Sequence, residues 1–203
     1  MRIFRSILFY ALFYFGSATF FLLFSPVRFF STKFVIKLSV IWTTSVIRLT
    51  KTVLKIDYSI IGKENIPDSG PFIVASNHQS AWETFFFGSY FPGSVFILKH
   101  ELKRLPILTQ YFKRLGFIFI NREKKINSLK NALNSIKKLL SEDKKVFIIF
   151  PEGTRLKPGQ KTKLNSGVFA IHKLFKIPIL PVKLNSGETW TNKSLSKKNG
   201  EIK

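Results

Sequence analysis

His78 and Glu83 are the two residues whose types and spacing could perform proton-transfer chemistry. A carboxylate that holds one imidazole nitrogen leaves the other nitrogen free to accept a proton, so the pair would act as a general base and its orienting partner. Positions five apart on a continuous helix face about 140° apart and cannot meet. The pair therefore predicts that His78 lies in a loop and that Glu83 lies in the first turn of the following helix.

The residues around the pair, Asn77-His78-Gln79-Ser80-Ala81-Trp82-Glu83, favour that arrangement and also allow a simpler one. Ser80-x-x-Glu83 fits a capping box with Ser80 as the N-cap residue, which would start a helix there. In the simpler interpretation, Glu83 only caps the helix and His78 is an ordinary loop histidine. Spacing alone leaves both interpretations open.

The elements that must position these residues alternate along the chain. Short apolar runs predict strands at 56–61, 72–76, 95–98, 117–120, 146–150 and 179–184. Helical patterns lie between them at about 80–90, 126–140 and 166–175, and Pro106 must break or kink a further segment at 101–115. This alternation predicts an α/β fold with a largely parallel sheet flanked by helices.

Polar side chains follow four of the predicted strands. They are His78, Lys99, Arg122 and the group Glu152, Gly153, Thr154 and Arg155. Ligands of α/β proteins bind beyond the carboxyl ends of strands, where Gly153 permits close backbone approach and Arg155 can fork onto a phosphate or carboxylate. Basic residues are common in any loop of so basic a chain, and for Lys99 alone that explanation is the simpler one.

Composition narrows the choice of partners. The chain has 203 residues, 45% of them hydrophobic, which suits one domain with its own core. It carries 33 Lys and Arg against 11 Asp and Glu, a net charge of +22. Such an excess predicts a polyanionic partner: nucleic acid, anionic lipid, a phosphorylated substrate or an acidic carrier protein. There is no cysteine, which excludes disulfides and cysteine-based nucleophiles or metal sites.

The N-terminus favours a membrane. Residues 6–27 are 22 uncharged positions, roughly 33 Å as a helix, which matches the thickness of a hydrocarbon core. A cleaved signal peptide is the alternative, but it would have a shorter apolar region and a small-residue cleavage site. A second apolar stretch, 34–54, carries its basic residues on one stripe opposite apolar ones, as in a helix that lies in the interface of an anionic membrane. We therefore expect membrane-anchoring helices in 1–55 and a catalytic domain in 56–203.

Four blocks of sequence resemble the glycerolipid acyltransferase superfamily and occur in its order. They are 77–83, 116–122, Phe150-Pro151-Glu152-Gly153-Thr154-Arg155 and Ile177-Pro178-Ile179-Leu180-Pro181-Val182. The chain is most similar to bacterial 1-acyl-sn-glycerol-3-phosphate acyltransferases (lysophosphatidic acid acyltransferases) over about 56–187, and the paired N-terminal helices look like that family's membrane-docking element. Two positions depart from the family pattern: Glu83 stands where Asp is usual, and Asn121 where many relatives have an acidic residue. The chain ends at 200–203, where relatives enter a further strand, which leaves the completeness of the C-terminus open.

The resemblance implies transfer of an acyl chain from acyl-CoA or acyl carrier protein to the sn-2 hydroxyl of lysophosphatidic acid, forming phosphatidic acid in phospholipid biosynthesis. It makes His78 the base and Glu83 its partner. It assigns Arg122, Arg155 and Lys99 to the substrate phosphate. Glu152, Gly153 and Thr154 would shape the site, with a backbone N–H near Gly153 stabilising the oxyanion. The expectation includes no metal or redox cofactor, anionic membrane lipids but no nucleic acid as partners, and a bacterial inner-membrane location with the catalytic domain facing the cytosol.

Two alternatives stay open. The same chemistry could act on another acceptor, such as glycerol 3-phosphate or a different lysolipid. The chain could instead be a non-catalytic, membrane-tethered binder of anionic lipid or nucleic acid, but charge binding alone has no need for the His-x4-Glu pattern. The sequence does not choose the acyl length, the donor or the oligomeric state.

Overall fold

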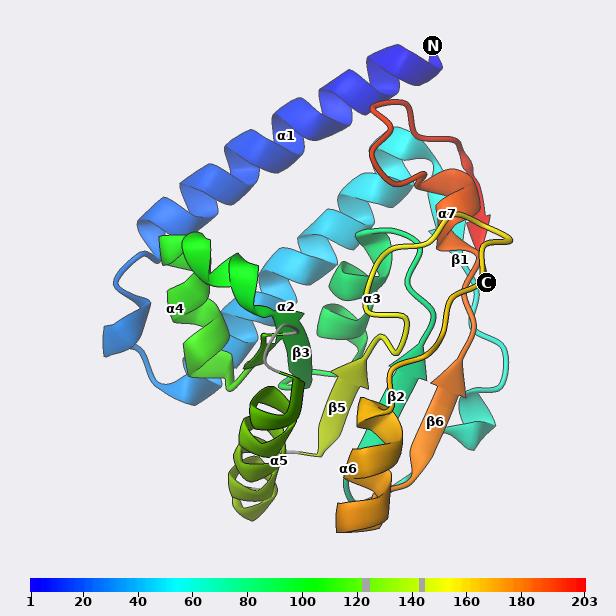
Figure 1. Cartoon of the computed structure of the whole chain (residues 1–203). Coiled ribbons are helices and arrows are strands. Elements are labelled where there is room, and N and C mark those ends of the chain that lie inside the picture. The colour runs from blue at the N-terminus through cyan, green and yellow to red at the C-terminus, as the bar shows by residue number, and fades with distance from the viewer. Residues whose placement is uncertain (122–124, 143–144) are drawn as a thin grey trace.

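A sheet of five parallel strands forms the centre of the computed structural model, in the order β4-β3-β5-β2-β6 (Figure 1). The strands are β2 (Phe72–Ser76), β3 (Val95–Lys99), β4 (Ile118–Ile120), β5 (Val146–Ile149) and β6 (Ile179–Val182). The structure describes residues 1–121, 125–142 and 145–203, without the side chains of 28, 125 and 126. The predicted α/β fold with a parallel sheet is thus confirmed, and the strand bounds agree with the expected ones to within two residues.

The two central strands owe their position to continuous apolar runs. Phe72, Ile73 and Val74 of β2 are almost fully buried, as are Phe147 and Ile148 of β5. Strands covered by helices on both faces have this composition, because neither face meets water. The carboxyl ends of β2 and β5 therefore lie side by side in the most rigid part of the molecule.

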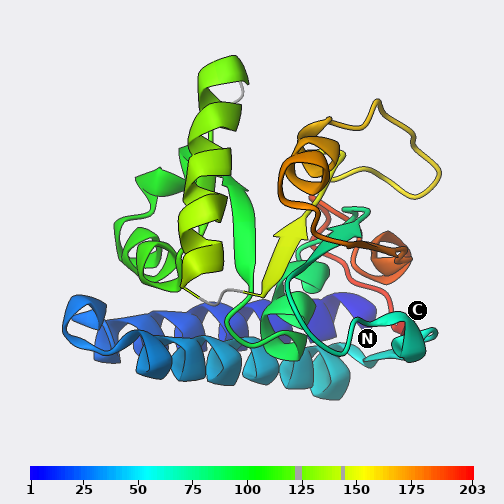
Figure 2. The same ribbon diagram turned by 90° about the horizontal axis from the view of Figure 1, so that it is seen from below.

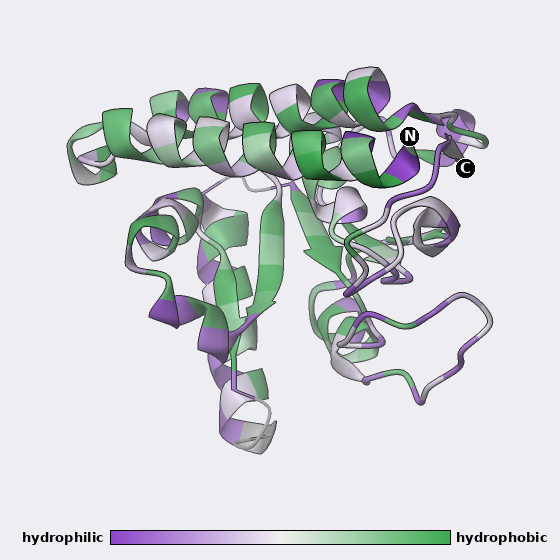
Figure 3. Ribbon diagram, turned by 90° about the horizontal axis from the view of Figure 1, so that it is seen from above, coloured by the Kyte–Doolittle hydropathy of each residue, from purple (hydrophilic) through white to green (hydrophobic). Residues whose placement is uncertain are grey.

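Helices cover both faces of the sheet. They are α1 (Arg2–Leu23), α2 (Thr32–Leu49), α3 (Trp82–Tyr90), α4 (Pro106–Leu115), α5 (Lys125–Ser141), α6 (Gly167–Phe175) and the short α7 (Ser186–Thr189). Helices α1 and α2 form a layer on one side of the molecule, while α5 and α6 lie on the other (Figures 2 and 3). The expected break at Pro106 is found where α4 begins with that proline in its first turn, after a short 3₁₀ helix at His100–Arg104.

Strands β3 and β5 pair only at their beginning. Val95 and Phe96 of β3 lie opposite Phe147 and Ile148 of β5, whereas residues 97–99 pair with β4 instead. The sheet is therefore open between β3 and β5 at its carboxyl edge. Ligands of open α/β sheets bind in crevices at this edge.

The N-terminal helices share the core of the sheet domain. Phe9 of α1 and Ile47 of α2 are buried in the same cluster as β2 and β5. Basic residues of the stripe on α2 and the π-helical turn Thr50–Leu54 are exposed as expected. The apolar face opposite them packs on protein, with Val35 at 0% and Val46 at 4% exposed, so the expectation that this face lies in a membrane was wrong. A division of the chain at 55/56 does not divide the hydrophobic core.

The exposed apolar surface of this layer belongs to α1. Its outward side chains are Ile3, Phe4, Ile7, Leu8, Leu12, Tyr14, Phe15, Leu22 and Leu23. Among the described residues, α1 is the one helix long and apolar enough to cross a membrane. It lies along the domain over its whole length, since Phe9 contacts Trp190 and Phe21 contacts Tyr111.

The strand expected at 56–61 is shorter and lies outside the main sheet. Strand β1 (Ile56–Tyr58) pairs in parallel with β7 (Gly200–Ile202) to form a second, two-stranded sheet. Residues 200–202 therefore do form the further strand that the resemblance implied.

Candidate active site

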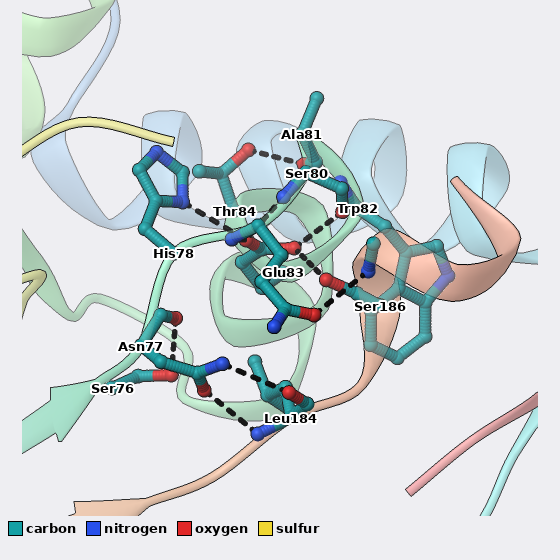
Figure 4. A network of polar contacts seen from close by, with 12 residues as sticks. Ser76, Asn77, His78, Ser80, Ala81, Trp82, Glu83, Thr84, Leu184 and Ser186 are labelled. Carbon is teal, nitrogen blue, oxygen red and sulfur yellow. Dashed lines mark hydrogen bonds and ion pairs between the residues drawn. The ribbon is translucent and has the colours of Figure 1, made fainter. Parts of the chain in front are cut away.

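His78 and Glu83 meet at the carboxyl end of β2. His78 lies in the loop after the strand and Glu83 in the first turn of α3, as their spacing requires. The imidazole Nδ1 lies 2.9 Å from Glu83 Oε1 (Figure 4). With the carboxylate as acceptor, Nδ1 carries the proton and Nε2 is left with its lone pair.

Five groups surround the Glu83 carboxylate, which has no solvent exposure. Oε1 accepts hydrogen bonds from the backbone N–H groups of Gln79 and Ser80 as well as from His78. Oε2 accepts from the hydroxyls of Ser80 and Ser186, at 2.5 and 2.8 Å. Burial alone would raise the pKa of Glu83, but the hydrogen bond and charge of His78, followed by the hydrogen bonds of Ser80, lower it. The carboxylate is held ionised.

The expected capping box is formed only in part. Glu83 does reach back to the N–H of Ser80, but the N-cap residue is Ala81, and the Ser80 hydroxyl accepts from Trp82 N instead. The Ser80 hydroxyl itself donates to Glu83. Glu83 therefore holds the loop and orients the imidazole at once. The capping interpretation and the catalytic interpretation of the motif do not exclude each other.

The imidazole of His78 is held from a second side. Its ring stacks on Phe150 with centroids 4.0 Å apart and planes 17° apart. The His78 backbone N–H donates to Glu152 Oε2 at 2.9 Å. The side chain is 14% exposed, so Nε2 has little room to reorient and limited contact with water.

The loop that carries His78 is fastened to the neighbouring strand ends. The amide of Asn77 makes two hydrogen bonds with the backbone of Leu184, of 2.8 and 2.7 Å. Gln79 Oε1 accepts from Gly187 N, and His78 O accepts from Leu156 N. Each bond joins β2 to a segment that follows β5 or β6, so the position of the histidine depends on three strands.

Gly153 adopts φ +69°, in the left-handed region that favours glycine. Its own N–H donates to Phe150 O at 2.9 Å and closes the turn. The expected oxyanion donor near this residue must therefore be a different amide. Thr154, which follows it, is exposed.

Arg155 lies over an apolar cavity next to the pair. The cavity has a volume of about 220 Å³ and lies between α2, α3 and α4, with Trp42, Phe85 and Leu108 among its walls. Arg155 retains solvent contact; partial burial lowers the pKa of its guanidinium, while the negative charge of Glu83 acts the other way. It stays charged at any physiological pH.

Of the other two expected phosphate ligands, the structure describes Lys99, which does not join this group. Lys99 is exposed at the end of β3, which β5 separates from β2. Arg122 lies outside the described residues. Among the described residues, Arg155 is thus the expected phosphate ligand that lies near the pair. Glu152 and Gly153 belong to the same loop after β5.

Two residues of the site lay beyond the reach of sequence reasoning. Ser186, the first residue of α7, donates to Glu83 across the site. Lys197 is 3% exposed and donates to the carbonyls of Thr191 and Ser194; burial, followed by repulsion from Arg155, lowers its pKa to about 8. Both lie in stretches without a recognisable motif.

The arrangement suits proton abstraction in a partly dry site. A neutral imidazole with a free nitrogen, an ionised partner and an adjacent cation can deprotonate a hydroxyl whose own phosphate is bound nearby. Within the part of the chain that the structure describes, no group of three His, Asp or Glu side chains could hold a metal ion.

Comparison with known proteins places this chain in one class, the acyltransferases. A family model described as Acyltransferase matches residues 57–185. The chain is 34% identical to the 1-acyl-sn-glycerol-3-phosphate acyltransferase of Pseudomonas aeruginosa over 98% of its own length and 77% of that protein. It is 34% identical to the enzyme of the same name from Saccharomyces cerevisiae, over 68% of this chain and 46% of that one.

The crystal structure of the 1-acyl-sn-glycerophosphate (LPA) acyltransferase PlsC from Thermotoga maritima has the same fold. It superimposes with a TM-score of 0.78 at 25% identity and covers 100% of this chain and 83% of that one. The chain belongs to the acyltransferase family, in its 1-acyl-sn-glycerol-3-phosphate acyltransferase branch.

Proposed function

We propose that this protein transfers an acyl chain from an acyl thioester to the sn-2 hydroxyl of 1-acyl-sn-glycerol-3-phosphate, forming phosphatidic acid. The observation that carries the proposal is the His78–Glu83 hydrogen bond of 2.9 Å at the end of β2, which occupies Nδ1 and leaves Nε2 as the nitrogen that can accept a proton. The similarity to the Pseudomonas enzyme over almost the whole chain supports the same acceptor.

In the proposed reaction His78 Nε2 takes the proton of the sn-2 hydroxyl as its oxygen attacks the thioester carbonyl. Glu83 fixes the tautomer and stabilises the imidazolium that forms. The collapse of the tetrahedral intermediate breaks the C–S bond, and the imidazolium returns the proton to the leaving thiolate. The hydroxyl of Ser80, in the same loop as His78, is already bound to Glu83 and Trp82 N, which favours direct transfer over an acyl-enzyme.

Arg155 would bind the phosphate of the acceptor, and the apolar cavity would bind the acyl chain of the donor. Arg155 can form two charge-assisted hydrogen bonds with the acceptor phosphate. The cavity beside it is lined mostly by apolar side chains, and an acyl chain of the donor would remove that surface from water.

The test of the function is a transfer assay with purified protein, a labelled acyl thioester and a panel of acceptors. We expect lysophosphatidic acid to be acylated with a higher kcat/KM than glycerol 3-phosphate, other lysolipids or monoacylglycerol. A preference for one of those acceptors would replace the substrate in the proposal. Binding of anionic lipid without transfer to any acceptor would replace the enzyme by a binding protein.

For the location, we propose that α1 lies in the surface of the bacterial inner membrane with the domain on the cytosolic side. The proposal rests on the exposed apolar side of α1 and on its contact with the domain along its length (Figure 3). A helix that crossed the membrane would leave those contacts. Lysophosphatidic acid could then reach His78 from the leaflet that holds α1.

Charged residues on the outer side of α1 should release the protein from membranes. Phe15 and Leu22 are 77% and 66% exposed. Each large apolar side chain placed in a membrane contributes about 1.5–3 kcal/mol, so Phe15→Asp or Leu22→Asp should weaken partitioning into vesicles at least about ten-fold. Flotation with phosphatidylglycerol vesicles measures it. The matched control is Ile61→Asp, since Ile61 is 83% exposed and does not belong to α1; equal release by all three variants would argue against α1 as the anchor.

A larger side chain in the cavity should shorten the preferred acyl chain. Ser39 of α2 lines the cavity, and its hydroxyl donates only to Ile36 O in its own helix. Ser39→Leu fills space that two methylene groups could occupy, worth about 1.6 kcal/mol, so the ratio of kcat/KM for an 18-carbon over a 12-carbon donor should fall about ten-fold. An unchanged ratio in a folded variant would mean that the chain lies elsewhere.

A further inference from the structure

A cleft of about 580 Å³ lies between α4 and α5, away from the catalytic pair. Ile118 and Phe119 of β4 form part of its wall. Strand β4 is at the edge of the sheet, and β3 and β5 separate it from β2, the strand that leads to His78. The residues that line the cleft include neither His78 nor Arg155. The cleft is therefore distinct from the candidate active site.

The charged side chains that line this cleft are mainly positive. They are the cations Lys103, Lys113, Arg114 and Lys138 and one carboxylate, Glu142. Lys138 lies 3.8 Å from Glu142, so these two charges offset each other. Within the described part of the chain, the other three cations form no ion pair with a carboxylate. The cleft thus gathers three positive charges from the 3₁₀ helix before α4 and from the last turn of α4 itself.

Arg114 is the most constrained of these cations. Its Nη2 donates to the carbonyl oxygen of Phe30, in the linker between α1 and α2. Its Nε is shielded from solvent and has no hydrogen-bond partner among the described residues. A guanidinium carries several N–H donors in a fixed plane, and buried donors without a partner are rare in proteins. An anion in the cleft can accept hydrogen bonds from the donors that Phe30 does not use.

The cleft lies next to the linker that follows α1. Thr32, the first residue of α2, lines it, and α4 packs on the 3₁₀ helix Val27–Phe29 of the linker (Figures 1 and 2). Phe29 is 74% exposed, and Leu22 and Leu23 at the end of α1 are 66% and 70% exposed. In the proposed membrane position of α1, these side chains enter the bilayer surface, where the phosphates of the surrounding lipids attract nearby cations.

We propose that the cleft between α4 and α5 binds the phosphate of an anionic glycerophospholipid from the membrane that holds α1, with Lys103, Lys113 and Arg114 as its ligands. The site takes no part in acyl transfer, and the inference rests on the proposed membrane position of α1. The unesterified oxygens of a phosphodiester can accept hydrogen bonds from a guanidinium and from ammonium groups at once. A soluble phosphate could use the same cations, but it needs no exposed Phe29 beside the site, which favours the lipid.

A lipid bound there would give the domain a second contact with the membrane. A single helix in the bilayer surface leaves the domain free to roll about the axis of that helix. A headgroup held on α4 removes this freedom, because α4 lies beside the linker and not on the axis of α1. Phe117 lines both this cleft and the acyl cavity, so the contact also fixes the cavity relative to the leaflet that supplies lysophosphatidic acid.

Binding of a short-chain lipid tests the site. The full chain in dodecyl maltoside micelles is titrated by calorimetry with dihexanoyl-phosphatidylglycerol, and we expect one saturable site. Lys103→Gln/Lys113→Gln changes two exposed residues and should raise the Kd at least about ten-fold, because each substitution removes a charge-assisted contact. Arg114→Gln should do the same, with thermal unfolding measured in parallel because it also loses the bond to Phe30.

The matched control is Lys37→Gln/Arg48→Gln. It removes two exposed positive charges from α2 that do not line the cleft, and the Kd should change less than about two-fold. Equal weakening by the control and by Lys103→Gln/Lys113→Gln would leave only a general attraction between the basic chain and anionic lipid. That result would overturn the site.

Competing anions and one active-site variant distinguish the remaining explanations. Arg155→Ala should bind the lipid with the Kd of the wild type; a weaker Kd would place the lipid in the acceptor site and overturn the inference. Inorganic phosphate that binds as tightly as the lipid would assign the cleft to a soluble anion, and displacement of the lipid by coenzyme A would assign it to the acyl donor. Either result would overturn the lipid site and leave the proposed acyl transfer intact, whereas a wild type without transfer activity would overturn the reaction and leave the site.

Discussion

Replacing His78 by alanine is expected to lower acyl transfer by about 10²–10⁴-fold, because the variant loses the group that accepts the hydroxyl proton. The imidazole contributes one stacking contact and one hydrogen bond to Glu83, and the loop that carries it is held by backbone bonds that alanine retains. The variant should therefore fold and bind membranes normally. Transfer from a labelled thioester, with thermal unfolding measured in parallel, checks both statements.

Glu83→Gln should be almost as harmful, although it changes only a charge. The Oε1 position faces two backbone N–H groups and the imidazole, so the amide must place its carbonyl oxygen there. Its NH₂ then meets the hydroxyls of Ser80 and Ser186, which can rotate. The loop keeps its shape, but no charge stabilises the imidazolium, and kcat should fall by about 10²–10⁴-fold.

His100→Ala is the matched control for the histidine, because His100 is exposed in the 3₁₀ helix that precedes α4. It should retain full activity. Near-normal turnover by a folded Glu83→Gln would show that Glu83 only holds the helix start and the loop. Substantial transfer by His78→Ala would require another base.

The contact between His78 and Glu83 was predictable because it is local. A strand of apolar residues, a loop of five residues and an apolar helix leave one geometry in which side chains five apart can touch. The order of strands and helices followed from the same kind of pattern, since each element has its own period of apolar residues. The predicted bounds differ from the observed ones at the ends of the elements. Helix α3, for example, begins at Trp82 and not near residue 80.

The features that the sequence could not predict depend on packing between residues far apart in the chain. Ser186 reaches Glu83 from 103 positions away, and nothing in its neighbours marks that contact. An amphipathic helix shows which side is apolar but not what covers it, and for α2 the cover is the protein itself through Val35 and Val46. Likewise, the expected row of ligands at the strand ends assumed evenly spaced strands, whereas β3 leaves β5 after Phe96 and carries Lys99 away from the pair.

Arg155→Ala is expected to depress kcat/KM for lysophosphatidic acid by roughly 30- to 1000-fold, the equivalent of about 2–4 kcal/mol for a lost charged contact. Glu83 is the carboxylate whose field reaches the guanidinium, and it is already bound to five hydrogen-bond donors. The charge of Arg155 is therefore available to the acceptor phosphate. Arg155→Lys keeps the charge but loses the two-pronged hydrogen bond, so it should restore activity only in part.

A comparison of neutral and phosphorylated acceptors tests whether Arg155 binds the phosphate. If Arg155 binds the phosphate, monoacylglycerol is a poor acceptor for the wild type and loses little more in Arg155→Ala, and hydrolysis of the thioester in the absence of acceptor changes little. Arg104→Ala, an exposed arginine in the 3₁₀ helix before α4, is the matched control and should leave both acceptors unaffected. Equal losses for neutral and phosphorylated acceptors would place Arg155 in the support of the loop after β5, where its charge would act on the fold of the site and not on the substrate.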